Sequence, residues 1–420
     1  MALLALALRS LWNRRSTALL TVFSLAVSVA LLLGVQKLRV GAKESFENTI
    51  SGVHLIVGAR SGALNLLLYS VFRVGDATAN VSWASYRKIA VHPDVEWTIP
   101  LSLGDSHRGY RVLGTSLDYF RHYRYAGDRA LEFASGQPFA DLYDVVLGAE
   151  VAERLGYSLG SAIIVAHGLG RVSFSEHADK PFRVVGILRR TGTPVDRTVH
   201  VSLEAITAIH LDWQGGVQAP PWARVTAEQA RAADLTPDSI TAFLLKMKEP
   251  ALVFTMQRSI NNYRDEPLTA VIPGVALKQL WDLVGIAEMA LTLIAVCVVL
   301  AGLLGMLTAI LTTLNERRRE MAIIRSVGAA PRHVFALLIA ESGLLALCGV
   351  LAGVALTYGL LLAVAPLIAD QYGIFIRAGG LTRDDVALLA LIVGSALVLG
   401  VLPAWRAYRH TLADGLSIRV

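Results

Sequence analysis

Four long stretches without any charged side chain constrain what this chain can fold into. Asp, Glu, Lys and Arg are absent from residues 17–35, 289–314, 342–369 and 386–405. Each stretch is long enough to supply the ~20 residues that a helix needs to cross the hydrocarbon of a bilayer. Charged residues make up 17% of the chain, against roughly 25% in soluble domains. The pattern predicts a membrane protein with four spans and excludes an ordinary soluble enzyme.

A block of mixed composition, residues 36–288, separates the first of these stretches from the other three. A block of this size can bury a core of its own. Short strand-like runs such as Phe182–Leu188 alternate in it with helical patterns. The helical pattern of the first span continues through residues 36–50, and that of the second span begins earlier, in residues 275–288. We expect both extensions to be helical stalks that run from the membrane into the outer domain. The predicted fold is four transmembrane helices, one plus three, with a large mixed α/β extracytoplasmic domain between the first and the second.

Arginines gather beside the spans on one side of the predicted topology. They lie in residues 1–16, in the loop 315–333 and in the tail 406–420, whereas Lys37, Arg39 and Lys43 lie beyond the other end of the first span. The three arginine segments are assigned to the cytoplasm by the positive-inside rule, with both termini on that side. The net charge of +6 is therefore attributed to topology and not to nucleic-acid binding.

The predicted order of segments follows from these assignments. Residues 1–12 are typical of an amphipathic helix at the membrane surface, and the first span is predicted to be a retained signal anchor. The segments are a cytoplasmic N-terminal helix (1–16), a first span (17–35), the outer domain with its stalks (36–288), a second span (289–314), a cytoplasmic coupling helix (315–333), a third span (334–369), a fourth span (386–405) and a cytoplasmic tail (406–420).

Several motifs for catalysis are missing from the sequence. It contains no G-x-x-x-x-G-K-[ST] phosphate loop, no H-E-x-x-H and no paired C-x-x-C. The two cysteines, Cys297 and Cys348, lie inside predicted spans and suggest neither a disulfide nor a zinc site. We therefore expect no catalytic residues. A membrane-anchored enzyme with its active site in the outer block is an alternative that no nucleophile–base arrangement supports.

Histidines are the candidate metal ligands of the outer block. Imidazoles with nearby carboxylates can bind zinc or copper, but the spacings here match no defined site. The alternative is that these are ordinary surface or hydrogen-bonded histidines. The candidates are His167, His177, His200 and His210.

The loop between the second and third spans has the features of a docking helix. On a helix, Glu316 and Glu320 share a face, with Arg317 beside them. Met321 and Ile324 belong to an apolar strip edged by these charges, which suits docking into a groove on a partner protein. The alternative is a solvated loop without a partner.

Three further residues stand out in or near the third span. Gly349 and Gly353 form a small-x-x-x-small pair that allows close packing of helices, within the chain or at a dimer interface. Glu341 lies about two turns into a helix that is expected to start near Pro331. Such a carboxylate either pairs with an arginine of the 317–325 segment or lies at the interface above the hydrocarbon.

The loop 315–335 resembles the cytoplasmic segment of FtsX-like and MacB-like permeases, the membrane subunits of type VII ABC transporters. Gly114–Phe120 and Phe182–Leu188 resemble parts of the MacB-type periplasmic domain, and Leu402–Ala407 resembles the P-A-x-x-A ending of the family. The tail after it departs from the family pattern at Thr411–Leu416. The loop matches the family motif at Glu316, Arg317, Glu320, Met321, Ala322, Arg325, Gly328 and Ala329.

The resemblance implies a non-catalytic permease subunit of a bacterial inner-membrane transporter. It would form a homodimer in the lipid bilayer, bind two copies of a cytoplasmic ABC ATPase that holds ATP and Mg, and contact a periplasmic or outer-membrane partner. The spans would transmit conformational change to the outer domain. The alternative is an FtsX-like regulator of periplasmic hydrolases, although the outer block is larger than such regulators usually carry. The coupling residues implied are Glu316, Arg317, Glu320, Met321, Ile324, Arg325 and Gly328.

Overall fold

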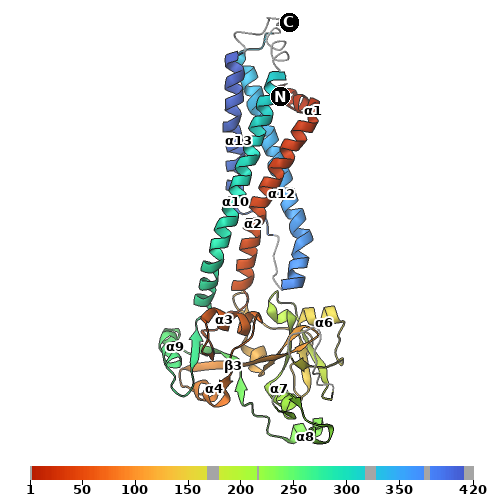
Figure 1. Cartoon of the computed structure of the whole chain (residues 1–420), viewed down its shortest axis with the longest axis vertical. Coiled ribbons are helices and arrows are strands. Elements are labelled where there is room, and N and C mark those ends of the chain that lie inside the picture. Colours follow the sequence, from red (N-terminus) through yellow and green to blue (C-terminus); the bar gives the residue numbers. More distant parts are fainter. Residues whose placement is uncertain (1, 168–178, 215–216, 317–327, 373–378, 411–420) are drawn as a thin grey trace. The chain divides into compact units, whose positions relative to one another are not determined.

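The structure, a computed structural model, describes residues 2–167, 179–214, 217–316, 328–372 and 379–410. It contains four helices that are long and apolar enough to cross a membrane (Figure 1). A large mixed α/β part lies in the chain between the first and the second of them, so the predicted fold class is confirmed. The four are α2 (Arg15–Glu47), α10 (Pro273–Glu316), α12 (Pro331–Tyr372) and α13 (Arg383–His410), and a shorter helix, α1 (Ala2–Asn13), precedes them.

Contacts divide the chain into two compact units. We call residues 1–41, 285–369 and 376–420 the helical unit, and residues 42–284 and 370–375 the α/β unit. Two helices belong to both units, because α2 continues past its uncharged stretch to Glu47 and α10 begins at Pro273. Of the residues predicted to form stalks, 36–47 lie within α2 and 275–288 lie within α10, whereas 48–50 follow the end of α2.

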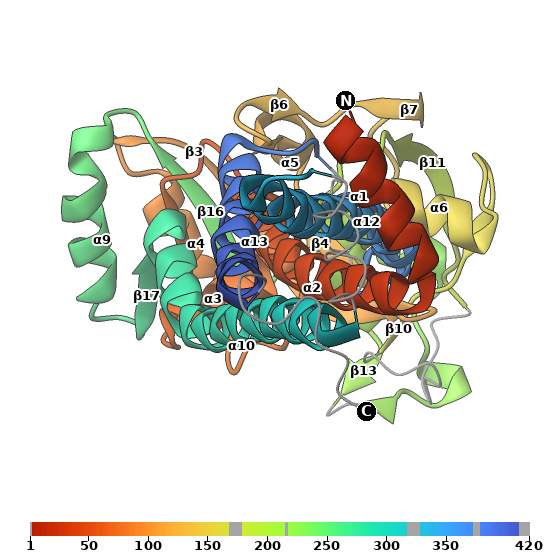
Figure 2. The ribbon, with the colours of Figure 1, turned by 90° about the horizontal axis from the view of Figure 1, so that it is seen from above.

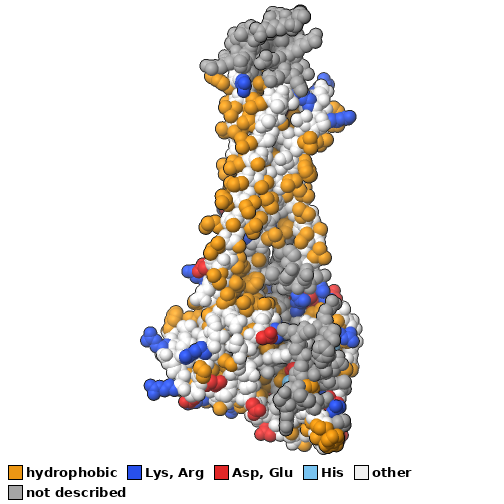
Figure 3. All heavy atoms as spheres, viewed as in Figure 1, with side chains coloured by type: hydrophobic (Ala, Val, Ile, Leu, Met, Phe, Trp, Pro, Cys, Tyr) orange, Lys and Arg blue, Asp and Glu red, His pale blue; other side chains and the backbone are white. Residues whose placement is uncertain are grey.

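The helical unit packs its four long helices around one apolar core, and Figure 2 shows them gathered side by side. Leu25 and Val29 of α2 meet Met306 of α10, Ala346 of α12 and Ala396 of α13 in this core. Other Leu, Val and Phe side chains point outward and cover the surface of the helices (Figure 3). This outer layer suits contact with lipid tails, and the helical backbone satisfies its own polar groups there.

Two glycines of α12 allow it to lie directly against α2. A Cβ atom built on Gly349 would lie 2.8 Å from Cδ2 of Leu25. One built on Gly353 would lie 2.6 Å from Cβ of Val29 and 2.9 Å from the carbonyl oxygen of Ala26. The predicted packing pair therefore faces a helix of the same chain. The helices approach so closely at this point that only hydrogen fits between them.

A mixed sheet forms the centre of the α/β unit. Among the described residues its strands run in the order β17-β1-β16-β3-β4-β12-β8-β11-β7, with β10 beside β3 and β9 beside β11. Pairs are antiparallel except for β4 with β12 and β8 with β11. The strands are β1 (Leu55–Ala59), β3 (Val95–His107), β4 (Tyr110–Thr115), β7 (Phe133–Gly136), β8 (Asp144–Leu147), β9 (Ala162–Ile163), β10 (Ala166–His167), β11 (Phe182–Leu188), β12 (Thr198–Ser202), β16 (Ala242–Met247) and β17 (Leu268–Val271).

Helices cover both faces of this sheet, which explains the unbroken apolar runs in its strands. Successive side chains of a strand face opposite sides. Leu55 and Val57 of β1 accordingly belong to a cluster under α4 and α9, and Ile56 belongs to the opposite cluster under α3 and α5. The helices are α3 (Ala63–Leu67), continued by a π-helical turn (Leu68–Phe72), α4 (Trp83–Ala90), α5 (Asp118–His122), α6 (Ala149–Leu155), α7 (Leu203–His210), α8 (Ala227–Ala232) and α9 (Val253–Asn261).

Short strand pairs complete the unit outside the main sheet. They are β2 (Val81–Ser82) with β15 (Ser239–Ile240), β5 (Arg124–Tyr125) with β6 (Arg129–Ala130), and β13 (Trp213–Gln214) with β14 (Val217–Gln218).

His200 of β12 lies entirely inside the α/β unit. Its ring packs against Tyr119 and Phe120, with ring centroids 5.2 and 6.0 Å away. Its Nδ1 donates to the carbonyl of Val146 at 3.3 Å. Burial disfavours the charged imidazolium, and this lowers the pKa of His200 from 6.5 to about 3. His200 is therefore neutral throughout the physiological pH range.

Gly353→Ala should loosen the bundle, because its methyl group meets the backbone of α2 and cannot be accommodated by a side-chain rotation. We expect a loss of ~1–3 kcal/mol, the usual range for overpacking. The measurement is the free energy of unfolding of the purified chain in detergent. Gly359→Ala is the matched control, since a Cβ there meets nothing within 4 Å. Equal effects of the two substitutions would contradict the packing described.

Stability of the α/β unit should depend on the neutral form of His200. The unfolded chain binds a proton near pH 6.5 and the folded chain only near pH 3. The free energy of unfolding should thus be highest above pH 6.5 and fall by up to ~1.4 kcal/mol per pH unit between these values. Urea unfolding of the wild type and of His200→Gln between pH 3 and pH 7 tests this pH dependence of the unfolding free energy. His200→Gln should have a shallower slope than wild type, and equal slopes would contradict this role of His200.

Candidate functional site

The predicted coupling segment lies mostly outside the described residues. This applies to Arg317, Glu320, Met321, Ile324 and Arg325. On the two sides of it, α10 ends at Glu316 and α12 begins at Pro331, with the proline in the first helical turn. Gly328 is exposed and has a φ of +100°, a conformation that other residues rarely adopt. Its place just before α12 agrees with a chain reversal at this point.

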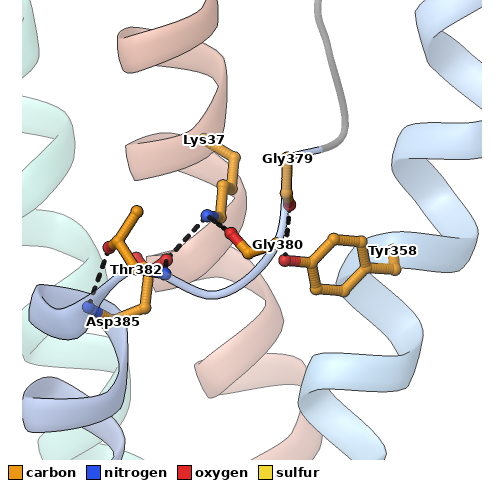
Figure 4. Close-up of polar contacts among 6 residues, drawn as sticks. All are labelled: Lys37, Tyr358, Gly379, Gly380, Thr382 and Asp385. Atoms are coloured by element: carbon orange, nitrogen blue, oxygen red, sulfur yellow. Dashed lines mark hydrogen bonds and ion pairs between the residues drawn. The ribbon is translucent and has the colours of Figure 1, made fainter.

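A buried ion pair joins two of the long helices (Figure 4). Lys37 lies two residues beyond the uncharged stretch of α2, and Asp385 directly precedes that of α13. Nζ of Lys37 donates to Oδ2 of Asp385 at 2.6 Å and to the carbonyl of Gly380 at 2.9 Å. The Lys37 side chain is 9% exposed and that of Asp385 is 1% exposed. The pair fixes the start of α13 against α2.

The start of α13 is shaped to present this carboxylate. The hydroxyl of Thr382 accepts from the backbone N–H of Asp385 at 3.2 Å, and Oδ2 of Asp385 accepts from the N–H of Thr382 at 2.8 Å. This reciprocal arrangement is a capping box, which satisfies two N–H groups at a helix start. A carboxylate at this position is also favoured by the helix dipole. The same oxygen of Asp385, Oδ2, therefore caps the start of α13 and accepts the hydrogen bond from Lys37.

Two more contacts surround the ion pair. The hydroxyl of Tyr358 in α12 donates to the carbonyl of Gly379 at 2.8 Å (Figure 4). Arg39 of α2 pairs with Glu288 of α10 at 3.0 Å, and its side chain is 55% exposed. Polar contacts thus link α2 to α13 and α10, and link α12 to the segment before α13. The exposed pair contributes little, because solvent screens it, whereas the buried pair is costly to break.

The sequence alone did not reveal this ion pair. Lys37 looked like a flanking charge on the side opposite the arginine clusters. The Thr-x-x-Asp pattern of residues 382–385 ahead of an apolar run is a recognisable helix start. The pairing of Asp385 with Lys37 joins residues 348 apart in the chain, and only packing of the helices brings them together.

The candidate metal ligands are not assembled among the described residues. No group of three His, Cys, Asp or Glu side chains suited to a metal ion occurs in that part of the chain. His200 is buried, as described above. His210, at the end of α7, has its Nδ1 2.6 Å from the carbonyl of Ile206 and its Nε2 3.7 Å from Asp105. His177 lies outside the described residues, and only the backbone of His167 is described.

Comparisons with known proteins identify both parts of the chain. Residues 18–263, more than half of the chain, match the MacB-like periplasmic core domain. Residues 292–412 match the C-terminal region of FtsX-like permeases. The two matches follow each other in the order in which the α/β unit and the last three long helices occur in the chain.

Individual relatives are distant but cover most of the chain. The pyoverdine export ATP-binding/permease protein PvdT of Pseudomonas savastanoi is 24% identical over 335 residues, which cover 76% of this chain and 45% of PvdT. The macrolide export ATP-binding/permease protein MacB of Shewanella sp. ANA-3 is 22% identical, over 99% of this chain and 60% of MacB. The lipoprotein-releasing system transmembrane protein LolC of Neisseria meningitidis is 22% identical, over 69% of this chain and 70% of LolC.

The chain spans about half the length of the first of these relatives. The matched residues include α12 and α13, most of α2, the second half of α10 and most of the α/β unit. This is a multi-pass membrane protein with a periplasmic domain, and the chain belongs to the ABC transporter permease family in which an FtsX-like permease region is combined with a MacB-like periplasmic core domain.

Proposed function

We propose that this chain is the permease subunit of a type VII ABC transporter of the bacterial inner membrane. In this proposal a dimer of the chain binds two copies of a cytoplasmic ABC ATPase, and both termini are cytoplasmic. ATP hydrolysis moves the coupling segment, and the long helices pass the movement to the periplasmic domain. Family membership supports the class of transporter, and the arginine-rich flanks support the orientation.

The observation that carries this proposal is the continuity of two helices. α2 runs from Arg15 to Glu47 without a break, and α10 runs from Pro273 to Glu316. Each extends well beyond its uncharged stretch at the end where it joins the periplasmic domain. A helix is rigid along its axis because every turn is hydrogen-bonded to the next. A shift or tilt at the cytoplasmic end of such a helix is therefore transmitted to its other end.

The apolar core of the helical unit supports transmission of force over passage of a polar substrate through the spans. Among the described residues of this unit, the buried charged side chains are Lys37, Glu341 and Asp385. Two of them neutralise each other, and all three lie near the edges of the uncharged stretches. The names of the relatives given above refer to three chemically different substrates, which are pyoverdine, macrolides and lipoproteins. A shared coupling device accounts for the similarity better than a shared substrate pocket does.

The coupling segment should be required for communication with the ATPase. We expect scrambling of residues 317–329 at constant composition, or Glu320→Arg, to lower permease-stimulated ATP hydrolysis by on the order of tenfold, the effect of losing a central interface contact. The measurement uses the chain in nanodiscs with an ABC ATPase that co-purifies with it. Glu44→Arg, an exposed site near the far end of α2, is the charge-matched control. Normal stimulation by the scrambled variant would refute this assignment of the segment.

The Lys37–Asp385 pair should be needed for transmission beyond its part in stability. Lys37→Met or Asp385→Asn alone leaves a buried partner without its counterpart and should cost ~3–5 kcal/mol of unfolding free energy. The double variant Lys37→Met/Asp385→Leu should recover most of this stability, because an apolar pair can replace a buried ion pair. It should nevertheless keep a reduced transport rate, since α13 is no longer fixed to α2 by a directional contact.

The control for this experiment is the Arg39–Glu288 pair, which joins α2 to α10 and in which the Arg39 side chain is exposed. Arg39→Met/Glu288→Leu should change stability by less than about 1 kcal/mol and leave transport unchanged. Transport and unfolding free energy are measured on the same preparations. A stable Lys37→Met/Asp385→Leu variant with wild-type transport would show that the buried pair serves packing alone.

A further inference from the structure

The short N-terminal helix α1 is attached to the helical unit by one face. Ala7 is fully buried and Leu11 packs against the common core of the four long helices. On the other face Leu8 is 52% exposed and Trp12 is 76% exposed, next to the exposed Arg9. This division suits a helix that lies at the membrane surface, with its outer face among lipid headgroups.

Two polar contacts connect α1 and the residue after it to different long helices. Nη1 of Arg14 donates to the carbonyl of Thr313, in the last turn of α10, at 3.1 Å. The hydroxyl of Ser10 donates to Oε1 of Glu341, in the third turn of α12, at 3.3 Å. The chain that joins α10 to α12 contains the coupling segment. The N-terminal contacts therefore lie on both sides of that segment.

Each contact meets a need of the group that accepts it. A hydrogen bond from a charged donor is stronger than one between neutral groups. Arg14 supplies such a donor to the carbonyl of Thr313. Glu341 is 5% exposed, and a buried carboxylate requires hydrogen-bond donors. Ser10 supplies one such donor. Losing either contact thus has a cost beyond that of an ordinary surface hydrogen bond.

We propose that α1 is a positioning element that holds Thr313 of α10 and Glu341 of α12 at a fixed separation, and that coupling to the ATPase depends on this separation. This inference rests on the proposed function. Arg14 and Ser10 are the positioning residues, and Glu341 is the anchor on α12.

The first experiment does not need the ATPase. We expect Arg14→Gln to raise amide hydrogen exchange in residues 310–316 of the full chain in nanodiscs by about tenfold, the effect of losing one hydrogen bond to a charged group. Arg15→Gln is the matched control, because it removes the same charge from an exposed neighbouring side chain. Unchanged exchange in Arg14→Gln, or equal exchange in the two variants, would overturn the inference.

The second experiment reads the coupling itself. With the ATPase present, Arg14→Gln and Glu341→Leu should lower stimulated ATP hydrolysis at least about fivefold, the effect of losing one hydrogen bond. Glu341→Gln should retain most stimulation, because its amide oxygen still accepts from Ser10. Stimulation of Arg14→Gln and Glu341→Leu equal to that of wild type would refute the inference and leave the proposed function standing. Absence of stimulation by the wild-type chain would instead refute the proposed function.

Discussion

Hydrocarbon cannot hydrogen-bond a polypeptide backbone, and the rest of this structure follows from that constraint. A spanning segment must satisfy every N–H and C=O group within itself, which makes it a helix. The four uncharged stretches become α2, α10, α12 and α13 for this reason. Because two of these helices do not stop where their apolar stretches end, the same hydrogen-bonded rods serve both as membrane spans and as connections to the periplasmic domain.

The hydrophobic effect contributes little to the association of helices in lipid, because lipid tails are as apolar as the helix surfaces. Close packing and polar contacts must therefore hold the helices together. Close packing is provided where Gly349 and Gly353 let α12 touch the backbone of α2. Direction is provided by the Lys37–Asp385 pair, because an ion pair with a shared capping box has one geometry and an apolar surface has many. A bundle built in this way has one defined register of its helices.

The periplasmic domain is held together differently, by apolar clusters on the two faces of a central sheet. Its central sheet is covered on both faces, and a strand such as β1 is therefore buried along its whole length. Even His200 is enclosed as a neutral side chain between aromatic rings.

The sequence by itself determined the spans, their order and the class of the periplasmic domain, because hydropathy and periodicity are local properties that a short window of residues contains. It also indicated the coupling segment and the glycine pair, whose signals are similarly local. Only the tertiary structure decided that Gly349 and Gly353 face α2, that Lys37 meets Asp385, and that Ser10 and Arg14 reach α12 and α10. Each of these contacts joins residues hundreds of positions apart, and such pairings depend on how the helices pack and not on the identity of any one stretch.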